Sequence, residues 1–148
     1  IVLRTLSKAL AFAGARCGAA LGPPEVIRML SAVQAPYAIA TPVSECVEDA
    51  LQESGIQEAA SRIADIVSER ERMSAALQSF WFVERLWPSA ANFLFLQLRQ
   101  APHVLEQVRN DKILLRDFGG DLDDCVRITI GSQAENDQLL TSLERVSR

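Results

Sequence analysis

The sequence has few of the residues that define several large protein classes, beginning with histidine and cysteine. It contains a single histidine, His103, which lies outside every motif and is expected at the surface. Histidine-based catalytic triads and metal clusters are therefore excluded, and we expect no metal site. The three cysteines, Cys17, Cys46 and Cys125, are widely spaced and form no Cys-x-x-Cys motif. This usage favours reduced, partly buried thiols in a cytoplasmic protein over a disulfide framework.

Long basic runs and long apolar runs are also missing. The net charge is −4 and the pI is about 5.0, which argues against a nucleic-acid partner. No apolar segment is long enough to cross a bilayer, so we expect no membrane partner. The chain has 148 residues, of which 49% are hydrophobic and 23% charged, a composition typical of a folded globular protein. It starts at Ile1 without a leader pattern, so we expect it to begin within a longer protein.

The stretch with the greatest chemical potential is residues 5–18. Lys8 stands between Ser7 and a small residue, and Arg16 follows eight positions later. A lysine amine can form a Schiff base with an aldehyde cofactor. A serine hydroxyl and an arginine guanidinium both suit a phosphate. On residue types alone, Lys8 and Arg16 could also be ordinary solvated side chains.

The first 80 residues show strand and helix patterns in alternation. Thr41 is expected to cap a helix that ends at Gly55. The long helix that follows carries a charged run, residues 69–72, which is expected to be solvated. The predicted elements are buried strands at residues 1–3 and 16–22, a helix from Glu25 with an apolar face up to Val33, a helix from Thr41, and a helix at residues 56–80.

From residue 81 the pattern predicts a different layer. Ser132 and Glu135 have the spacing of a capping box that opens the last helix, whose inner face is Leu139, Leu143 and Val146. The order strand-strand-helix-strand-strand-helix indicates an α+β arrangement. The predicted elements are strands at residues 82–87, 92–98, 113–116 and 126–130. Between the second and third strands, a helix is predicted at residues 102–110, with Val104, Leu105 and Val108 facing inward.

Two arginines lie in the last two predicted strands. Because side chains alternate along a strand, Arg127 should face away from its apolar neighbours. Such an arginine needs a partner, which could be a substrate carboxylate or a structural acid such as Asp123 or Asp124. Arg116 could hold a second anion, or it could pair with the adjacent Asp117.

Several of these segments resemble a known family. Thr5–Gly14 is similar to the lysine signature of pyridoxal-phosphate aminotransferases of fold type I and matches each of its constrained positions. The wider string Ile1–Gly18, the pair Ala35-Pro36-Tyr37 and Thr41-Pro42, and Cys125–Gly131 resemble the histidinol-phosphate aminotransferase family. The similarity covers essentially the whole chain, but the chain would be only the C-terminal part of such an enzyme.

The resemblance implies a fold of mixed class, α/β and α+β. Residues 1–55 would be the C-terminal remnant of the large cofactor-binding domain, residues 56–80 a linking helix, and residues 81–148 a small α+β domain. The full-length enzyme would be a cytoplasmic homodimer.

The resemblance also implies roles for individual residues. Lys8 would form the Schiff base with pyridoxal 5′-phosphate, and Ser7 and Arg16 would bind the cofactor phosphate. Arg127 would bind the substrate carboxylate, and Arg116 would help to bind the phosphorylated substrate. Tyr37 is a candidate for the rim of the site, although a packed aromatic is the more common role for such a residue.

The reaction implied is that of histidinol phosphate with 2-oxoglutarate, which gives imidazole-acetol phosphate and glutamate in histidine biosynthesis. The family places further cofactor-ring residues upstream of Ile1, so the isolated chain is expected to be inactive. Two alternatives remain open. One is another enzyme of the same fold, such as a threonine-phosphate decarboxylase or an aromatic aminotransferase. The other is a non-catalytic α+β module.

Overall fold

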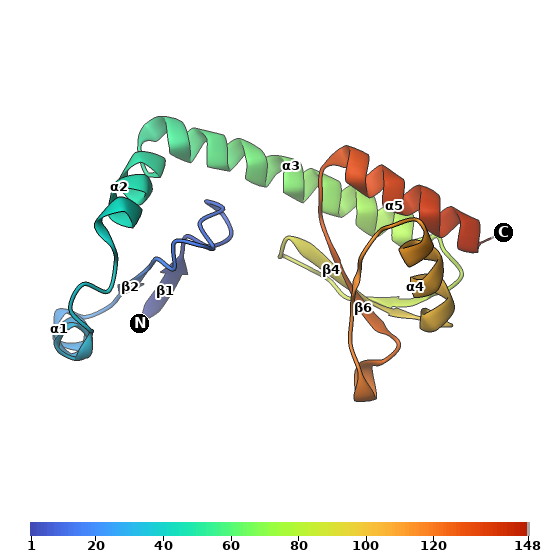
Figure 1. Ribbon diagram of the computed structural model, residues 1–148, viewed down its shortest axis with the longest axis horizontal. Helices are drawn as coiled ribbons and strands as arrows, with labels where there is room; N and C mark the ends of the chain where they lie inside the picture. The colour runs from blue at the N-terminus through green and yellow to red at the C-terminus, as the bar shows by residue number, and fades with distance from the viewer. Residues whose placement is uncertain (148) are drawn as a thin grey trace. The chain divides into compact units, whose positions relative to one another are not determined.

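The computed structural model describes residues 1–147 and divides the chain into two compact units, one ending at Ile63 and one starting at Ala64. Figure 1 shows the elements in chain order, from the N-terminal strands to α5. Helix α3, Glu53–Gln78, contributes its first turns to the first unit and its remaining turns to the second. Each unit is described separately.

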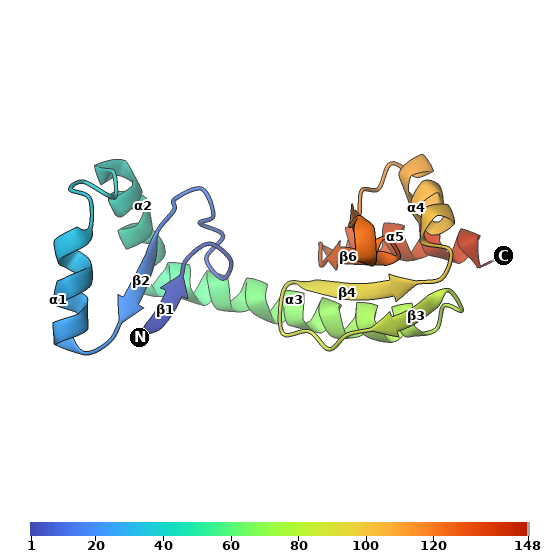
Figure 2. The same ribbon diagram turned by 90° about the horizontal axis from the view of Figure 1, so that it is seen from below.

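The first unit is built on a two-stranded ribbon. Strand β1, Val2–Thr5, runs antiparallel to β2, Gly18–Leu21, as Figure 2 shows. Thr5 lies opposite Gly18 in this pair. The positions of both strands were predicted, but the prediction that they are buried is wrong, because every residue of both strands is exposed. A ribbon of two strands leaves its faces in solvent unless another layer covers them.

The second helix of this unit begins differently from the prediction. Helix α1 spans Pro24–Val33 and α2 spans Thr41–Ala50. Thr41 is not the N-cap of α2, because the backbone N–H groups of Val43 and Ser44 donate to the carbonyl of Ala40. That pattern makes Ala40 the cap residue and Thr41 the first helical residue, and no side chain caps this end.

Gly55 does not end α2 as predicted. Helix α2 stops at Ala50 and α3 starts at Glu53, which places Gly55 in the first turn of α3. An ideal Cβ at Gly55 would lie 2.9 Å from the main-chain carbonyl carbon of Ala50. The glycine therefore lets the two helix ends approach closely at this corner, which is a packing role and not a terminating one.

Most apolar side chains of the first unit are exposed. Val47 is buried in α2, whereas Val33 of α1 is 81% exposed. Tyr37 is 98% exposed, so the expectation that it is a packed aromatic is wrong. Sequence periodicity predicts which residues share a face, but burial also needs an element that covers that face.

The second unit is a four-stranded antiparallel sheet with helices, and the predicted α+β order is confirmed. The third strand is shorter than predicted, because Ile113 bonds to the carbonyl of Val108 and stays with the preceding helix. The strands lie in the order β3-β4-β6-β5. The elements after α3 are β3 (Val83–Leu86), β4 (Phe93–Leu98), α4 (Ala101–Asn110), β5 (Arg116–Asp117), the 3-10 turn η1 (Gly120–Leu122), β6 (Cys125–Thr129) and α5 (Gln133–Val146).

The core of this unit lies between one face of the sheet and the helices. Burial alternates along β4, where Leu94, Leu96 and Leu98 are buried and the residues between them are half-buried. The core residues from the helices are Met73 and Leu77 of α3, Val104, Leu105 and Val108 of α4, and Leu139 and Leu143 of α5. The predicted inner faces of α4 and α5 are therefore confirmed, with Val146 half-buried. Along β6, Arg127 and Thr129 are exposed and alternate with the buried residues that face this core.

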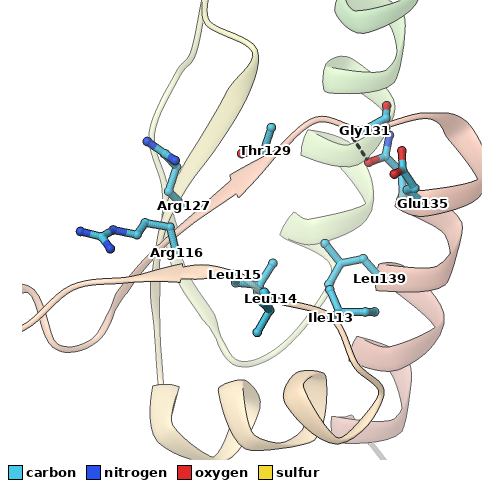
Figure 3. A pocket seen from close by; sticks show the side chains of 10 residues that line it. Ile113, Leu114, Leu115, Arg116, Arg127, Thr129, Gly131, Glu135 and Leu139 are labelled. Atoms are coloured by element: carbon cyan, nitrogen blue, oxygen red, sulfur yellow. Dashed lines mark hydrogen bonds between the residues drawn. The ribbon is translucent and has the colours of Figure 1, made fainter. Parts of the chain in front are cut away.

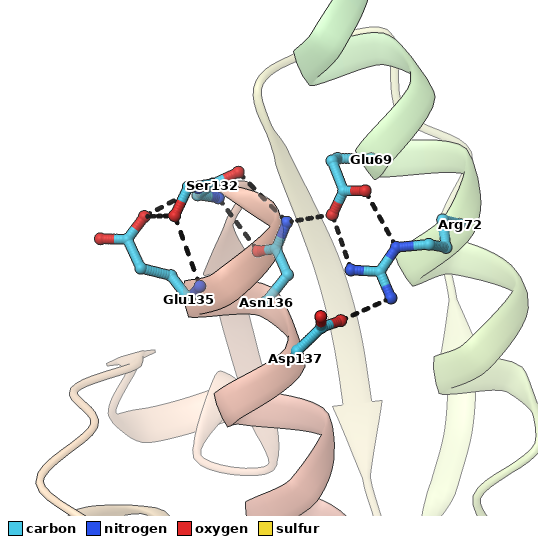
Figure 4. A network of polar contacts seen from close by, with 7 residues as sticks. Glu69, Arg72, Ser132, Glu135, Asn136 and Asp137 are labelled. Carbon is cyan, nitrogen blue, oxygen red and sulfur yellow. Dashed lines mark hydrogen bonds and ion pairs between the residues drawn. The ribbon is translucent and has the colours of Figure 1, made fainter.

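The charged run in α3 is only partly the solvated surface that was predicted, because Glu71 alone of its four residues is exposed. Arg72 donates to Glu69 at 2.7 Å and to Asp137 of α5 at 2.8 Å, as Figure 4 shows. Arg70 donates to the carbonyl of Ala91 at 3.0 Å. Because α5 packs along this part of α3, these side chains are half-buried and need partners.

The contacts of Asp111, at the end of α4, predict that the fold loses stability at acid pH. Asp111 accepts hydrogen bonds from Ser142 at 2.7 Å, Arg145 at 2.8 Å and Gln107 at 3.2 Å. The Ser142 hydroxyl, followed by Gln107 and Arg145, holds the pKa of Asp111 below its usual range against the effect of burial. A carboxylate with a lowered folded pKa stabilises the fold above its unfolded pKa of about 3.9, and this stability is lost as the pH falls through the folded pKa.

We therefore expect Asp111→Asn to flatten the acid limb of the stability curve. Urea unfolding measured from pH 7 to pH 2.5 should give a smaller difference between neutral and acid pH in this variant than in the parent chain. Asp121→Asn, at an exposed position in η1, serves as the matched control. An acid limb of unchanged steepness in Asp111→Asn would contradict the assignment.

Candidate active site

The candidate cofactor residues lie in one connection of the first unit. Ser7, Lys8 and Arg16 all belong to the loop that joins β1 to β2, visible in Figure 1. The loop is closed at its base, where the N–H of Leu6 donates to the carbonyl of Cys17 at 3.3 Å. The fold therefore places three residues from positions 7 to 16 at the same end of a hairpin.

Local hydrogen bonds order the serine and the arginine. The Thr5 hydroxyl donates to the Ser7 hydroxyl at 2.7 Å, and the Ser7 N–H donates to Thr5 Oγ1 at 3.1 Å. One Nη atom of Arg16 donates to the carbonyl of Ala13 at 3.1 Å. Lys8 is exposed, and neither it nor Arg16 forms an ion pair within residues 1–147.

The backbone of this loop is constrained where it returns to the ribbon. Arg16 has a φ of 51°, a left-handed conformation that is uncommon for a residue with a side chain. Two residues later, a Cβ at Gly18 would lie 2.8 Å from the carbonyl oxygen of Arg4 on the paired strand. Gly18 therefore allows β2 to approach β1 closely, two residues after Arg16.

The residues of this loop fit a phosphorylated aldehyde. An exposed amine can react with an aldehyde, and a hydroxyl with a guanidinium can donate to a phosphate. Arg16 uses a main-chain carbonyl and no carboxylate as its partner, so its charge is not neutralised within the loop.

A second candidate site is a pocket of about 460 Å³ in the second unit. Figure 3 shows Arg116 and Arg127 on neighbouring strands at one end of the pocket, while Ile113 and Leu139 lie at the other end. The pocket therefore has a cationic end and an apolar end. It is lined by Ile113, Leu114, Leu115, Arg116, Arg127, Thr129, Gly131, Glu135, Asn136 and Leu139.

The two arginines are direct neighbours across the sheet. The register of β5 and β6 places Arg116 opposite Arg127. Along β6, Arg127 and Thr129 are exposed and their neighbours are buried, which confirms the predicted alternation. Two like charges in directly opposed positions destabilise a strand pair, so an anion bound close to both arginines would offset this cost.

Two of the three acids considered as partners of these arginines are engaged elsewhere, and the third, Asp123, forms no ion pair within residues 1–147. Asp117 accepts from Arg109 at 2.8 Å, and Asp124 accepts from Gln97 at 2.6 Å. Gln97 and then Cys125 hold the pKa of Asp124 below its usual range against the effect of burial. Within residues 1–147, Arg116 and Arg127 form no ion pair. The alternative that they are structural ion-pair residues is therefore wrong for the described chain.

Asn136 is a pocket residue that the sequence analysis missed. It is buried, and its amide bonds to both the N–H and the carbonyl of Gly131 at 3.1 Å. Its amide also donates to Glu69 of α3 at 2.8 Å. The predicted capping box is present beside it, where Ser132 and Glu135 bond reciprocally. The capping box was the sequence signal that could have identified Asn136. It places the residue after Glu135 in the first turn of a helix that directly follows a strand.

The remaining expectations about reactive residues can be checked in the described chain. His103 is exposed, and residues 1–147 contain no cluster of residues that could hold a metal ion. Cys125 is buried and Cys17 is half-buried as expected, but Cys46 is exposed. Within the same residues, no helix has both the length and the apolarity needed to span a membrane.

Comparison with known proteins places this architecture. A crystal structure of an aminotransferase homologue from Burkholderia pseudomallei K96243 matches 99% of this chain and 45% of its own, with a TM-score of 0.88 and 30% identity. The histidinol-phosphate aminotransferase of Sinorhizobium meliloti, solved in complex with pyridoxal 5′-phosphate, matches 99% of this chain and 40% of its own, with a TM-score of 0.70 and 25% identity. The mixed α/β fold is therefore that of the fold type I aminotransferases.

The sequence comparison identifies the family. The family model for class I and II aminotransferases matches residues 1–143, and the chain belongs to this family. The histidinol-phosphate aminotransferase of Stenotrophomonas maltophilia strain R551-3 is 41% identical over 144 residues, which are 96% of this chain and 40% of that protein. The chain thus spans about two-fifths of the length of the curated relatives it matches.

Proposed function

We propose that the complete protein carrying this chain is a pyridoxal-phosphate transaminase that acts on histidinol phosphate and 2-oxoglutarate. The observation that carries the proposal is the β1–β2 connection, in which Ser7, Lys8 and Arg16 share one loop and no carboxylate neutralises the two cations. The 41% identity to a protein named histidinol-phosphate aminotransferase supports the choice of substrate.

In this proposal the first unit supplies the chemical residues. Ser7 Oγ and the guanidinium of Arg16 hold the cofactor phosphate by hydrogen bonds. Pyridoxal phosphate, when bound, supplies an aldehyde that takes up the substrate amine and a ring that stores the electron pair released at the reacting carbon. Lys8 Nζ removes the proton from the amine-bearing carbon of the donor, and it returns a proton to the corresponding carbon in the reverse half of the reaction.

The second unit supplies anion recognition. Both substrates carry anions, a phosphate on histidinol phosphate and two carboxylates on 2-oxoglutarate. Arg127 binds the carboxylate of the oxo acid, and Arg116, its cross-strand neighbour, helps to bind the phosphorylated substrate. Guanidinium forks suit both groups, because each can accept two parallel N–H bonds.

The same proposal covers the organisation of the complete protein. Residues 1–55 belong to the large cofactor-binding domain, residues 56–80 form the linking helix, and residues 81–148 form the small domain. The complete enzyme is a cytoplasmic homodimer. The isolated chain is inactive, because the residues that contact the cofactor ring lie outside it.

Chemical trapping and a substrate panel test the proposal. Borohydride reduction of the complete protein with pyridoxal phosphate should fix the cofactor to Lys8, and peptide mapping should leave Lys112, the other lysine of this chain, unlabelled. The reduced protein should be inactive. Among donors, histidinol phosphate should give the highest kcat/KM with 2-oxoglutarate as acceptor.

Other outcomes of the panel would replace the proposal. Release of carbon dioxide without an oxo-acid acceptor would indicate a decarboxylase. Preference for an aromatic amino acid would indicate an aromatic aminotransferase. Failure to trap any cofactor on Lys8 of the complete protein would favour a non-catalytic module.

A further inference from the structure

Each pocket arginine lies over a phenylalanine ring. The guanidinium carbon of Arg127 is 5.4 Å from the ring centroid of Phe93 in β4, and that of Arg116 is 5.6 Å from the ring centroid of Phe118, just after β5. Both distances lie within the range of about 6 Å in which a cation is attracted to a ring face. The rings contact these arginines where the sequence analysis considered a structural acid as one of two possible partners.

A ring and a carboxylate hold an arginine in different ways. A carboxylate takes up the N–H donors at the edge of the guanidinium plane and neutralises its charge. An aromatic face contacts the plane itself, so the edge N–H groups and the positive charge stay available to a ligand. This difference matters here because Arg116 and Arg127 stand opposite each other and form no ion pair within residues 1–147.

The two rings are themselves fixed by the sheet. Phe93 lies opposite Thr129 in the β4–β6 register and is half-buried. Phe118 contacts Phe95 edge-on, with centroids 5.6 Å apart and planes at 81°. Phe95 in turn lies 4.9 Å from Trp87, measured between centroids. Phe118 therefore belongs to a packed aromatic row with Phe95 and Trp87, whereas Phe93 is fixed by its place in the paired strand β4. Both positions limit the freedom of the rings to move away from the arginines.

We propose that Phe93 and Phe118 are positioning residues, which hold Arg127 and Arg116 ready for anionic substrates through their ring faces. This inference rests on the proposed function, because it assumes that the two arginines bind the anions of the substrates. It assigns no contact between either ring and the substrate. Specificity for anions then depends on arginines that are oriented but not neutralised.

Graded fluorination of Phe93 is the sharpest test, because fluorine withdraws charge from the ring face and changes its size little. In the complete enzyme, Phe93 would be replaced by 4-fluoro-, 3,5-difluoro- and 3,4,5-trifluorophenylalanine. Dissociation constants for inorganic phosphate and for 2-oxoglutarate would be measured by calorimetry, together with kcat, KM and Tm. Trp81, an exposed ring that contacts Phe82 and lies outside both the pocket lining and the row formed by Trp87, Phe95 and Phe118, is the matched control.

The expected result is a stepwise loss of anion affinity with each fluorine. The trifluoro variant and Phe93→Leu should raise the dissociation constant for 2-oxoglutarate by about 2–5-fold, with a matching rise in KM, because a ring face contributes on this scale at a partly exposed site. Phe93→Tyr keeps an aromatic ring face and should bind both anions with the parent affinity. Trp81→Leu should leave both dissociation constants at the parent values. Phe118 should show the same trend for phosphate.

Two results separate this inference from the function on which it rests. If Arg127→Gln weakens 2-oxoglutarate binding but the fluorinated series does not, the ring faces have no positioning role and the inference is overturned. If neither Arg127→Gln nor Arg116→Gln changes the affinity for its anion, the proposed anion recognition itself is wrong. A change in Tm without a change in affinity would show that Phe93 has a packing role alone.

Discussion

Replacement of Lys8 by alanine in the complete enzyme is expected to abolish measurable turnover. The exposed amine at the start of the β1–β2 loop is proposed to bond to the cofactor and to carry the proton during catalysis. General acid–base catalysis alone contributes about 10²–10⁴-fold, and loss of the covalent link adds to that, so kcat should fall by at least about 10⁴-fold. Single-turnover and steady-state assays at saturating substrate would measure the loss.

Two further variants show whether the loss comes from the amine itself. Lys8→Arg keeps the positive charge and the length of the side chain, but a guanidinium stays protonated and does not act as a base. It should therefore be as inactive as the alanine variant. Lys112→Ala removes the other lysine of the chain, at an exposed site after α4, and should retain parent activity. Steady turnover by either Lys8 variant would remove Lys8 from the mechanism.

The features that the sequence predicted well are those set by local spacing. Alternation along residues 126–130 placed Arg127 on the face opposite the core, and the burial pattern of β6 confirms this. The capping box at Ser132 and Glu135 and the inner face of α4 are equally local, and both are present. These features depend on residues within one turn or one strand, where backbone periodicity alone decides orientation.

The features that the sequence could not predict depend on residues far apart in the chain. Asp117 is adjacent to Arg116, yet it pairs with Arg109, because alternation along the short strand separates neighbouring side chains. The bond between Glu69 and Asn136 joins residues 67 positions apart. A charged run in a helix is usually solvated, so only knowledge of the helix that packs against it would have predicted this partner.

The first unit shows the same limit for burial. Periodicity predicted an apolar face on α1, but Val33 is 81% exposed and Leu3 of β1 is 77% exposed. An apolar face indicates that another element should cover it, but it does not identify that element. We propose the role of the Lys8 loop from its residue types, its constrained backbone and the family resemblance.

The largest effect expected on stability concerns Asn136. Its side chain is 2% exposed, and it accepts from the N–H of Gly131 while donating to the Gly131 carbonyl and to Glu69. Asn136 thus ties the end of β6, the strand that carries Arg127, to both α5 and α3, as Figure 4 shows. Only a side-chain amide can accept and donate in this way at one position.

Asn136→Asp should destabilise the fold by about 3–5 kcal/mol at pH 7, although the two side chains have nearly the same size. The introduced carboxylate keeps the bond from the Gly131 N–H but loses both donated bonds, and it faces the carboxylate of Glu69. Burial and this repulsion should raise the folded pKa of the new carboxyl above its unfolded value. Its protonation therefore relieves the destabilisation as the pH falls, and urea unfolding at pH 7 and pH 5 would measure the difference.

Two companion variants separate the lost bonds from the added charge. Asn136→Leu removes all three bonds without adding a charge, and it should cost about 2–3 kcal/mol with no relief at lower pH. Asn92→Asp adds the same charge at an exposed position and should change stability by less than about 0.5 kcal/mol. If Asn136→Asp were as stable as the parent at pH 7, the three bonds would not be what fastens β6 to α3.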